Sequence, residues 1–272
     1  MQKDEIARIL RRARRELHYT FNGTLLSSKK GEGFDFAELQ PYTEGIDAKK
    51  IYWNSLAKGS GLQYKRYFEE KEIYAVVSLF LDGSLCFGES PSKLEKAVEA
   101  AAWLGYRIVE SGNIFQGVAL SQKGRVAAAP SKKRSSVESF IADAAGIDPL
   151  LTELDYAAAS EWLFGHVMKK SLIFLVGDFL EIPDLGKLAR RHQLYAIVVR
   201  ERFELDPRPL GACSLTDPQN GKSAELFFDR RSAAHYREKF RAHDARLQHY
   251  FRRHNIFCHY LPTDRPTGSM VL

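Results

Sequence analysis

The stretch Ile73-Tyr-Ala-Val-Val-Ser-Leu-Phe-Leu81-Asp82-Gly-Ser84 decides how the rest of the chain is interpreted. From Ile73 to Leu81 it is almost entirely apolar or β-branched and carries no charge, which is typical of a strand buried on both faces of a parallel sheet. The strand then ends on a carboxylate, and a helical pattern begins at residues 91 and 92. Polar oxygens at the carboxyl end of a central strand lie where open α/β sheets bind their ligands.

The same pattern returns at residues 171–178. The apolar run Ser171-Leu-Ile-Phe-Leu-Val-Gly177 ends on Asp178, and a helical stretch follows. One aspartate at the end of a strand is ordinary helix-cap or turn chemistry. Two buried strands that bring aspartates to the same edge of a sheet instead predict a shared site at that edge.

Strand and helix patterns alternate along the remaining chain. This alternation predicts an α/β fold, a doubly wound and mostly parallel sheet with helices on both faces. Residues 1–70 are expected to form an N-terminal helix and a covering segment, and residues 71–272 to form the sheet domain. We expect helices at 3–18, 91–111, 136–145, 184–192 and 232–253, strands at 114–120, 125–129, 194–199 and 256–261, and a hairpin at 210–216 and 223–228.

Composition limits the class of protein. A chain of 272 residues with 44% hydrophobic content is long enough to bury a substantial core. No apolar run reaches the ~18 residues of a membrane span, and the N-terminal residues alternate charge with apolar side chains, unlike a secretion signal. The three cysteines are widely spaced and form no Cys-x-x-Cys pair, which argues against a disulfide framework and a zinc ribbon. We therefore expect a soluble, cytoplasmic protein.

The formal net charge of +6 is concentrated in two segments. Residues 1–18 hold six basic and three acidic side chains, and residues 230–253 hold eight basic and two acidic ones, so the rest of the chain is net acidic. Basic helices can follow phosphate groups or an acidic partner, although most such faces are simply solvated. A nucleic-acid-binding accessory protein is therefore one alternative function, although no known nucleic-acid-binding module is present.

Residues 33–70 mix aromatic and charged side chains without a clean helix or strand period. On composition alone, Trp53 and the neighbouring tyrosines would be packing residues. The order of residues, with Trp53-Asn54 and then Arg66-Tyr-Phe-Glu-Glu70, resembles the bacterial DUF58 family, in which this segment leads into a von Willebrand factor A-like domain. The matching positions are Phe36, Glu38, Leu39, Tyr42, Gly45, Asp47, Ile51 and Trp53, whereas Gln40, Ile46 and Tyr52 depart from the family's pattern.

The resemblance also implies a cation site at the sheet edge. Domains of this kind hold a divalent cation through Asp-x-Ser-x-Ser after the first strand, a threonine in a later loop and an aspartate after the fourth strand. Magnesium, the expected ion, prefers oxygen donors, with Mn²⁺ or Ca²⁺ as alternatives. A thiol is a soft ligand and replaces a hydroxyl poorly, so a metal-free version of the same edge stays open. The corresponding residues are Asp82, Ser84, Cys86, Thr152 and Asp178, with Cys86 where the second serine belongs.

The same resemblance implies a non-enzymatic adaptor that works with a MoxR-type AAA+ ATPase and binds a client protein. Its expected mechanism is capture through the cation, whose open position accepts a carboxylate of the partner. A metal-dependent hydrolase or phosphoryl-transfer enzyme would use the same aspartates, and this is a second alternative. The sequence offers that enzyme no evident general base and no second metal cluster.

Overall fold

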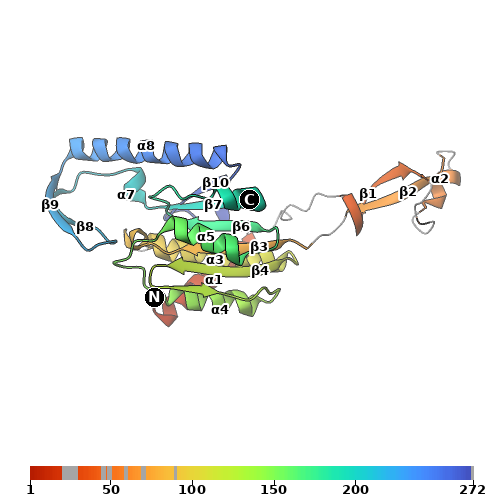
Figure 1. Ribbon diagram of the computed structural model, residues 1–272, viewed down its shortest axis with the longest axis horizontal. Helices are drawn as coiled ribbons and strands as arrows, with labels where there is room; N and C mark the ends of the chain where they lie inside the picture. Colours follow the sequence, from red (N-terminus) through yellow and green to blue (C-terminus); the bar gives the residue numbers. More distant parts are fainter. Residues whose placement is uncertain are drawn as a thin grey trace. The chain divides into compact units, whose positions relative to one another are not determined.

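The computed structural model describes residues 1–19, 30–43, 47, 51–57, 61–68, 72–88 and 91–270 (Figure 1). The chain divides into two units, one formed by Met1–Asn22 and Tyr74–Leu272 and the other by Gly23–Ile73. The boundary predicted between residues 70 and 71 assigned the first helix to the N-terminal part. That assignment is corrected here, because helix α1 (Lys3–Tyr19) packs on helix α3 (Lys93–Glu110) and belongs with the sheet unit.

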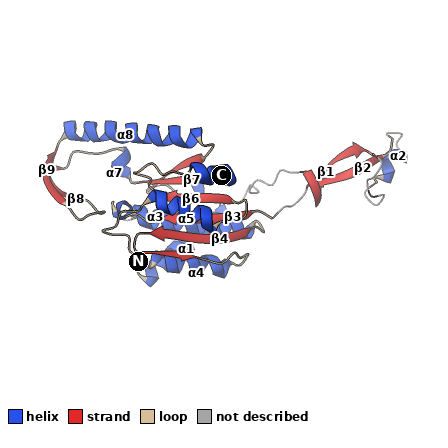
Figure 2. Cartoon of the chain, viewed as in Figure 1, coloured by secondary structure: helices blue, strands red, loops and turns tan. Residues whose placement is uncertain are grey.

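The larger unit is built on a six-stranded sheet in the order β10-β7-β6-β3-β4-β5. Figure 2 shows β7, β6, β3 and β4 side by side in this sheet. All neighbouring strands are parallel except β5, which pairs antiparallel with β4 at one edge. The chain starts at the central β3, runs outward through β4 and β5, and then returns to β6 on the other side, so the topological switch point lies between β3 and β6. The predicted α/β, mostly parallel fold is confirmed. The strands are β3 (Tyr74–Phe80), β4 (Ile114–Ser121), β5 (Gly124–Ala127), β6 (Leu172–Gly177), β7 (Gln193–Arg200) and β10 (Phe257–Pro262).

Helices cover both faces of this sheet, as the continuous apolar strands require. Helix α3 contacts β3 and β4 on one face. Val76 and Phe80, two residues of β3 with the same side-chain direction, belong to a core cluster with residues of α5, α6 and α8 on the other face. The remaining helices of this unit are α4 (Arg134–Ala145), α5 (Tyr156–His166), α6 (Gly186–Arg191), α7 (Arg202–Leu205), α8 (Arg230–Arg253), η2 (Gly83–Cys86) and η3 (Thr267–Ser269).

The start of α3 is fixed by a capping box. The Ser92 hydroxyl accepts the Glu95 backbone N–H at 3.2 Å, and the Glu95 carboxylate accepts the Ser92 N–H at 2.8 Å. The helix buries both small residues, such as Ala97 and Ala101, and large ones, such as Trp103, against the rest of the unit. Close packing and a fixed first turn place Lys93, the first helical residue, beneath the carboxyl edge of the sheet.

The hairpin predicted after β7 is confirmed, and it forms a sheet of its own. Strands β8 (Gly211–Thr216) and β9 (Ser223–Phe228) pair antiparallel with each other. The short helix α7, which the sequence did not predict, lies between β7 and this hairpin. The hairpin turn carries Gln219, whose side chain donates a hydrogen bond to Asp82 at the carboxyl edge of the main sheet. Within the described residues, no helix has the length and apolar content needed to cross a membrane.

The smaller unit contains a hairpin that the sequence did not predict. Strands β1 (Lys30–Pro41) and β2 (Gln63–Phe68) pair antiparallel, and helix α2 (Trp53–Ala57) lies between them in the chain. Register shifts on either side of Phe36 break the period of two, which explains why no strand pattern was visible. Trp53 is 61% exposed, so it is not a packing residue within its own unit. Gly45 and Ile46 of the family pattern lie outside the described residues.

A buried histidine of the larger unit should give its stability a pH dependence. His192 is 4% exposed, and its Nδ1 accepts the Ser171 N–H at 3.2 Å, which requires that nitrogen to be unprotonated. Burial, followed by the adjacent Arg191 cation, lowers the pKa of His192 from 6.5 to about 4. The unfolded chain therefore binds a proton that the folded chain rejects between these values, so stability is present above pH 6.5 and is lost as the pH falls.

We expect the replacement His192→Asn to remove that pH dependence, because an amide oxygen can still accept the Ser171 N–H but does not titrate. Between pH 6.5 and pH 4, the wild type should lose about 3 kcal/mol more than the variant. Urea unfolding at a series of pH values measures this difference. His249→Asn, on the exposed side of α8, is the matched control and should follow the wild type. Parallel profiles for wild type and His192→Asn would refute the assignment.

Candidate functional site

Several loops meet at the carboxyl edge of the sheet, beside the switch point. Asp82 lies two residues past the end of β3, and Asp178 directly follows β6, the strand that pairs with β3 in parallel. The segment 147–155, the segment 178–185 and the β8–β9 turn complete the edge. Residues far apart in the sequence are therefore neighbours here because parallel strands end at the same edge.

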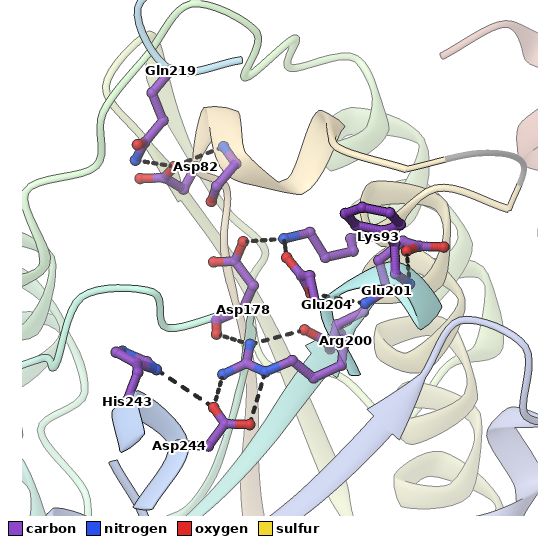
Figure 3. A network of polar contacts seen from close by, with 12 residues as sticks. Asp82, Lys93, Asp178, Arg200, Glu201, Glu204, Gln219, His243 and Asp244 are labelled. Atoms are coloured by element: carbon purple, nitrogen blue, oxygen red, sulfur yellow. Dashed lines mark hydrogen bonds and ion pairs between the residues drawn. The ribbon is translucent and has the colours of Figure 1, made fainter. Parts of the chain in front are cut away.

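Asp82 joins three of these segments. Its buried carboxylate accepts the Ser84 N–H at 2.9 Å as the cap of η2 and the Leu154 N–H at 2.8 Å. It also accepts the Gln219 side-chain N–H at 2.8 Å (Figure 3). These three donors come from η2, from the loop before α5 and from the hairpin turn. The hydrogen bonds of Asp82 therefore hold the edge loops against the end of β3.

Gly83 allows those loops to approach the strand end. Its N–H donates to the Thr152 carbonyl at 3.0 Å. A β-carbon at this position would lie 2.6 Å from the Thr152 oxygen and 2.7 Å from the Pro218 oxygen, both of them backbone atoms. No side chain larger than hydrogen fits between the two loops, so glycine is required here by close approach.

Asp178 is part of a buried ion cluster. The Lys93 ammonium lies 2.9 Å from Asp178 Oδ2 and 2.5 Å from Glu204 Oε1, and the side chains of Lys93 and Asp178 are both 0% exposed (Figure 3). Arg200, the last residue of β7, donates to the Asp178 backbone carbonyl and pairs with Asp244 at 2.6 Å. The cluster joins α3, β6, β7, α7 and α8 beneath the edge.

The pKa values in this cluster follow from burial and charge. Burial alone would raise the pKa of Asp178, but Lys93, Ser84 and Arg200 together outweigh it and lower the pKa. Burial alone would lower the pKa of Lys93, but Asp178 and Glu204 raise it. Burial raises the pKa of Glu204, and Lys93 offsets this only in part. Asp178 and Lys93 therefore form the charged centre of the cluster.

The five predicted site residues come from loops that do meet, but most of their polar atoms already form hydrogen bonds or ion pairs within the protein. The Thr152 hydroxyl donates to the Pro149 carbonyl at 2.5 Å. Cys86 is half-buried, and burial raises the pKa of its thiol. Ser84 Oγ and Asp178 Oδ1 are buried without a partner in hydrogen-bond geometry in the described part of the chain, although Ser84 lies close enough to help lower the pKa of Asp178.

These contacts do not fit a divalent cation held between Asp82 and Asp178. Asp82 already accepts three N–H donors, and Asp178 already faces a buried ammonium group. The thiol of Cys86 is a poor ligand for magnesium. Across the residues described, no group of three or more His, Cys, Asp or Glu side chains is placed to hold a metal ion. The predicted Mg²⁺ site stays a prediction, and the arrangement of charges does not favour it.

The backbone is strained beside two of the predicted residues. Leu151 has φ of 60° immediately before Thr152, and Phe179 has φ of 49° immediately after Asp178. Bulky side chains in the left-handed region cost about 1–3 kcal/mol each, and such strain gathers at functional sites. Leu151 is also 58% exposed, and its N–H donates to the Pro218 carbonyl at 2.8 Å, so the loops hold an apolar side chain toward solvent.

A pocket of about 480 Å³ opens next to these residues. It lies between the loop before α5 and the loop after β6, and its floor includes Tyr156. The rim carries four carboxylates and the exposed Ile182. The carboxylates are Glu153, Asp155, Glu181 and Asp184. We call this pocket, together with Leu150, Leu151 and Ile182, the edge surface.

Sequence reasoning missed the residues that balance the charge of the edge. Arg200 carried a signal, because it is the first charged residue after an apolar strand. Lys93 carried a weaker one, as a cation in the first turn of a helix, where the dipole disfavours positive charge. Glu204 belongs to α7, which no sequence pattern predicted, and Gln219 lies in the turn of the predicted hairpin, where nothing in the sequence indicates a contact with Asp82.

The fold and the edge site together define the class of protein. A sheet in this strand order, with one antiparallel edge strand and polar loops at the switch point, is an α/β domain of the von Willebrand factor A-like type. Residues 38–250 match the family described as "Protein of unknown function DUF58", and the chain belongs to this family. No curated protein matches the chain significantly.

Solved structures similar to this chain have low sequence identity to it. Conserved hypothetical protein BatB from Bacteroides thetaiotaomicron has 13% identity and a TM-score of 0.40, covering 66% of this chain and 98% of that one. An aerotolerance-related membrane protein from Bacteroides fragilis NCTC 9343 has 11% identity and a TM-score of 0.39, covering 67% and 98%. The SpRpn10 VWA domain has 9% identity and a TM-score of 0.40, covering 73% and 93%.

Proposed function

We propose that this protein is a binding adaptor that captures a segment of a partner protein on its edge surface. The observation that carries the proposal is Leu151, an exposed leucine held in a left-handed backbone conformation at the ligand-binding edge of the sheet. An isolated exposed leucine needs no explanation, but strain in its backbone does. A contact with a partner supplies one, because the loops hold the side chain where a partner can cover it.

The charge of the edge surface indicates the chemistry of the partner segment. The pocket rim holds four exposed carboxylates beside three exposed apolar side chains. Such a surface favours a segment that combines lysine or arginine with apolar residues, since complementary charge steers and orders association. This differs from the mechanism expected from the sequence, in which a partner carboxylate completes the shell of a cation. An acidic segment would meet like charge here.

Membership of the DUF58 family makes a MoxR-type AAA+ ATPase the first partner to test. In this proposal the ATPase supplies the force for remodelling, and the adaptor presents the edge surface to the ATPase or to a client protein. The client itself is chemically defined only as a basic, apolar segment.

Leu151→Asn tests the proposal. Asparagine tolerates the left-handed region, so the variant should be as stable as the wild type or more so, while it loses the apolar side chain. We expect its affinity for a purified MoxR-type AAA+ ATPase from the same organism, measured by calorimetric titration, to fall about tenfold, or about 1.4 kcal/mol. Met168→Asn is the matched control. Met168 is 75% exposed and precedes β6, at the opposite edge of the sheet, and its replacement should leave affinity unchanged.

The possible outcomes distinguish an error in the proposed binding surface from an error in the proposed partner. If Leu151→Asn binds as tightly as the wild type, the edge surface is not the binding site. If the wild type itself does not bind the ATPase, the proposed partner is wrong. Thermal unfolding of both variants shows whether any loss of binding follows from a loss of fold.

The nucleic-acid alternative has one observation in its favour. Helix α8 buries few of its residues and exposes a series of basic side chains along its length. Binding to a mixed-sequence DNA duplex or RNA that weakens steeply with added salt would support it, because phosphate contacts release counterions. The exposed basic residues include Arg231, Lys239, Arg241, Arg246, Arg252 and Arg253.

A further inference from the structure

We propose that the ammonium group of Lys93 takes the place of a divalent cation in this protein, so that the edge is built to be stable without metal. The inference concerns the ion cluster itself and does not depend on which partner binds. It contradicts the Mg²⁺ site that the family resemblance implied, and it explains why the carboxylate of Asp178 is retained although no metal needs it.

The surroundings of Lys93 form a complete shell for one positive charge. The ammonium lies 2.9 Å from Asp178 Oδ2 and 2.5 Å from Glu204 Oε1, and its nitrogen is 5.7 Å from the centre of the Phe87 ring. The side chains of Lys93, Asp178 and Glu204 are each at most 3% exposed. A buried ammonium group is tolerated only when it is paired in this way.

The position of Lys93 is imposed by the fold. The capping box of Ser92 and Glu95 fixes the first turn of α3, and Lys93 is the first residue of that turn. A cation at a helix N-terminus opposes the helix dipole. The two carboxylates offset this cost. One belongs to the residue that follows β6 and the other to α7, so the arrangement exists only in the folded protein.

A divalent cation and Lys93 exclude each other at Asp178. Any metal on Asp178 Oδ1 would share one carboxylate with the ammonium on Oδ2, and two cations at that distance in a buried site repel strongly. Ser84 Oγ and Asp178 Oδ1 are both buried, and neither has a partner in hydrogen-bond geometry among the residues that the structure describes. They become ligands for a metal only when the charge of Lys93 is removed.

The test is Lys93→Met, which keeps an unbranched side chain one atom shorter than lysine and removes the charge. Wild-type protein titrated with Mn²⁺ and followed by electron paramagnetic resonance should show no saturable site at the cluster. Lys93→Met leaves two buried carboxylates uncompensated, so it should unfold at a lower temperature, bind one Mn²⁺ at least about tenfold more tightly than the wild type, and regain stability when Mn²⁺ is added.

Lys96→Met is the matched control. Lys96 is a second fully buried lysine of α3, but it pairs at 3.4 Å with a single carboxylate, Glu99. This variant should also lose stability, yet Mn²⁺ should not restore it. The double variant Lys93→Met with Glu204→Gln keeps one carboxylate, and its response to Mn²⁺ should be weaker than that of Lys93→Met.

Two results would overturn the inference. The first is a wild-type protein that binds one Mn²⁺ and loses it in Asp178→Asn, and this measurement does not depend on whether Lys93→Met folds. The second is a folded Lys93→Met that neither binds Mn²⁺ nor gains stability from it, because the cluster would then not be an alternative metal site.

Discussion

Asp82→Ala is expected to lower the free energy of unfolding by about 3 kcal/mol or more. The carboxylate of Asp82 is buried and accepts three N–H donors, two from the backbone and one from Gln219. Alanine leaves all three donors without an acceptor, and each unsatisfied buried donor costs about 1–3 kcal/mol. The loss should be visible in urea unfolding as a lower midpoint.

Asp155→Ala is the matched control for this prediction. Asp155 is also a capping carboxylate, since it accepts the Ala158 N–H at 2.9 Å, but it is exposed and serves one helix only. Its replacement should cost about 1 kcal/mol. Equal midpoints for the two variants would show that Asp82 is an ordinary cap and does not tie the edge loops together.

The same two proteins test the role of magnesium. If the edge needs no cation, Mg²⁺ and a chelator should change the unfolding midpoints of the wild type and of Asp82→Ala equally little. A wild-type midpoint that drops on chelation, with no such drop in Asp82→Ala, would restore the cation site expected from the sequence.

The sheet and the two strand-end aspartates could be predicted because the signals are local. The run from Tyr74 to Phe80 is apolar throughout, and so is the run from Leu172 to Gly177, as strands covered on both faces must be. Because both runs are parallel strands, their carboxyl ends lie at the same edge of the sheet. The placement of Asp82 and Asp178 at that edge could therefore be predicted without knowledge of any contact. The strands predicted at 114–120 and 125–129 likewise correspond to β4 and β5.

The charge balance of the edge could not be predicted, because it depends on contacts between distant elements. Lys93 meets Glu204 across more than a hundred positions of the chain, and Gln219 reaches Asp82 from a hairpin that interrupts the α/β alternation. From the sequence alone, a lysine in the first turn of a helix is expected to be a solvent-exposed charge. Its burial becomes visible only when β6 and α7 are placed beside α3, and this changes the interpretation of Asp178 from a metal ligand to the partner of an ammonium group.

Gly83→Ala should disrupt the same edge by a different cause. It adds an atom that overlaps the neighbouring loops, whereas Asp82→Ala removes hydrogen bonds. The new β-carbon would lie 2.6 Å and 2.7 Å from two backbone carbonyls in different loops, and neither can rotate away as a side chain would. We expect a loss of about 3 kcal/mol, at the upper end of the cost of overpacking. The displaced loops should also weaken the hydrogen bond from Leu154 to Asp82, so the Leu154 amide should exchange faster with solvent.

Gly124→Ala, at the first residue of β5, is the matched control because no atom lies within 4 Å of its β-carbon position. It should leave both the unfolding midpoint and the Leu154 exchange rate unchanged. Asp82→Ala and Gly83→Ala release the same loops, so the double variant should lose less than the sum of the single losses. Additive losses, or an unchanged Leu154 exchange rate in Gly83→Ala, would mean that Asp82 and Gly83 act on separate parts of the edge.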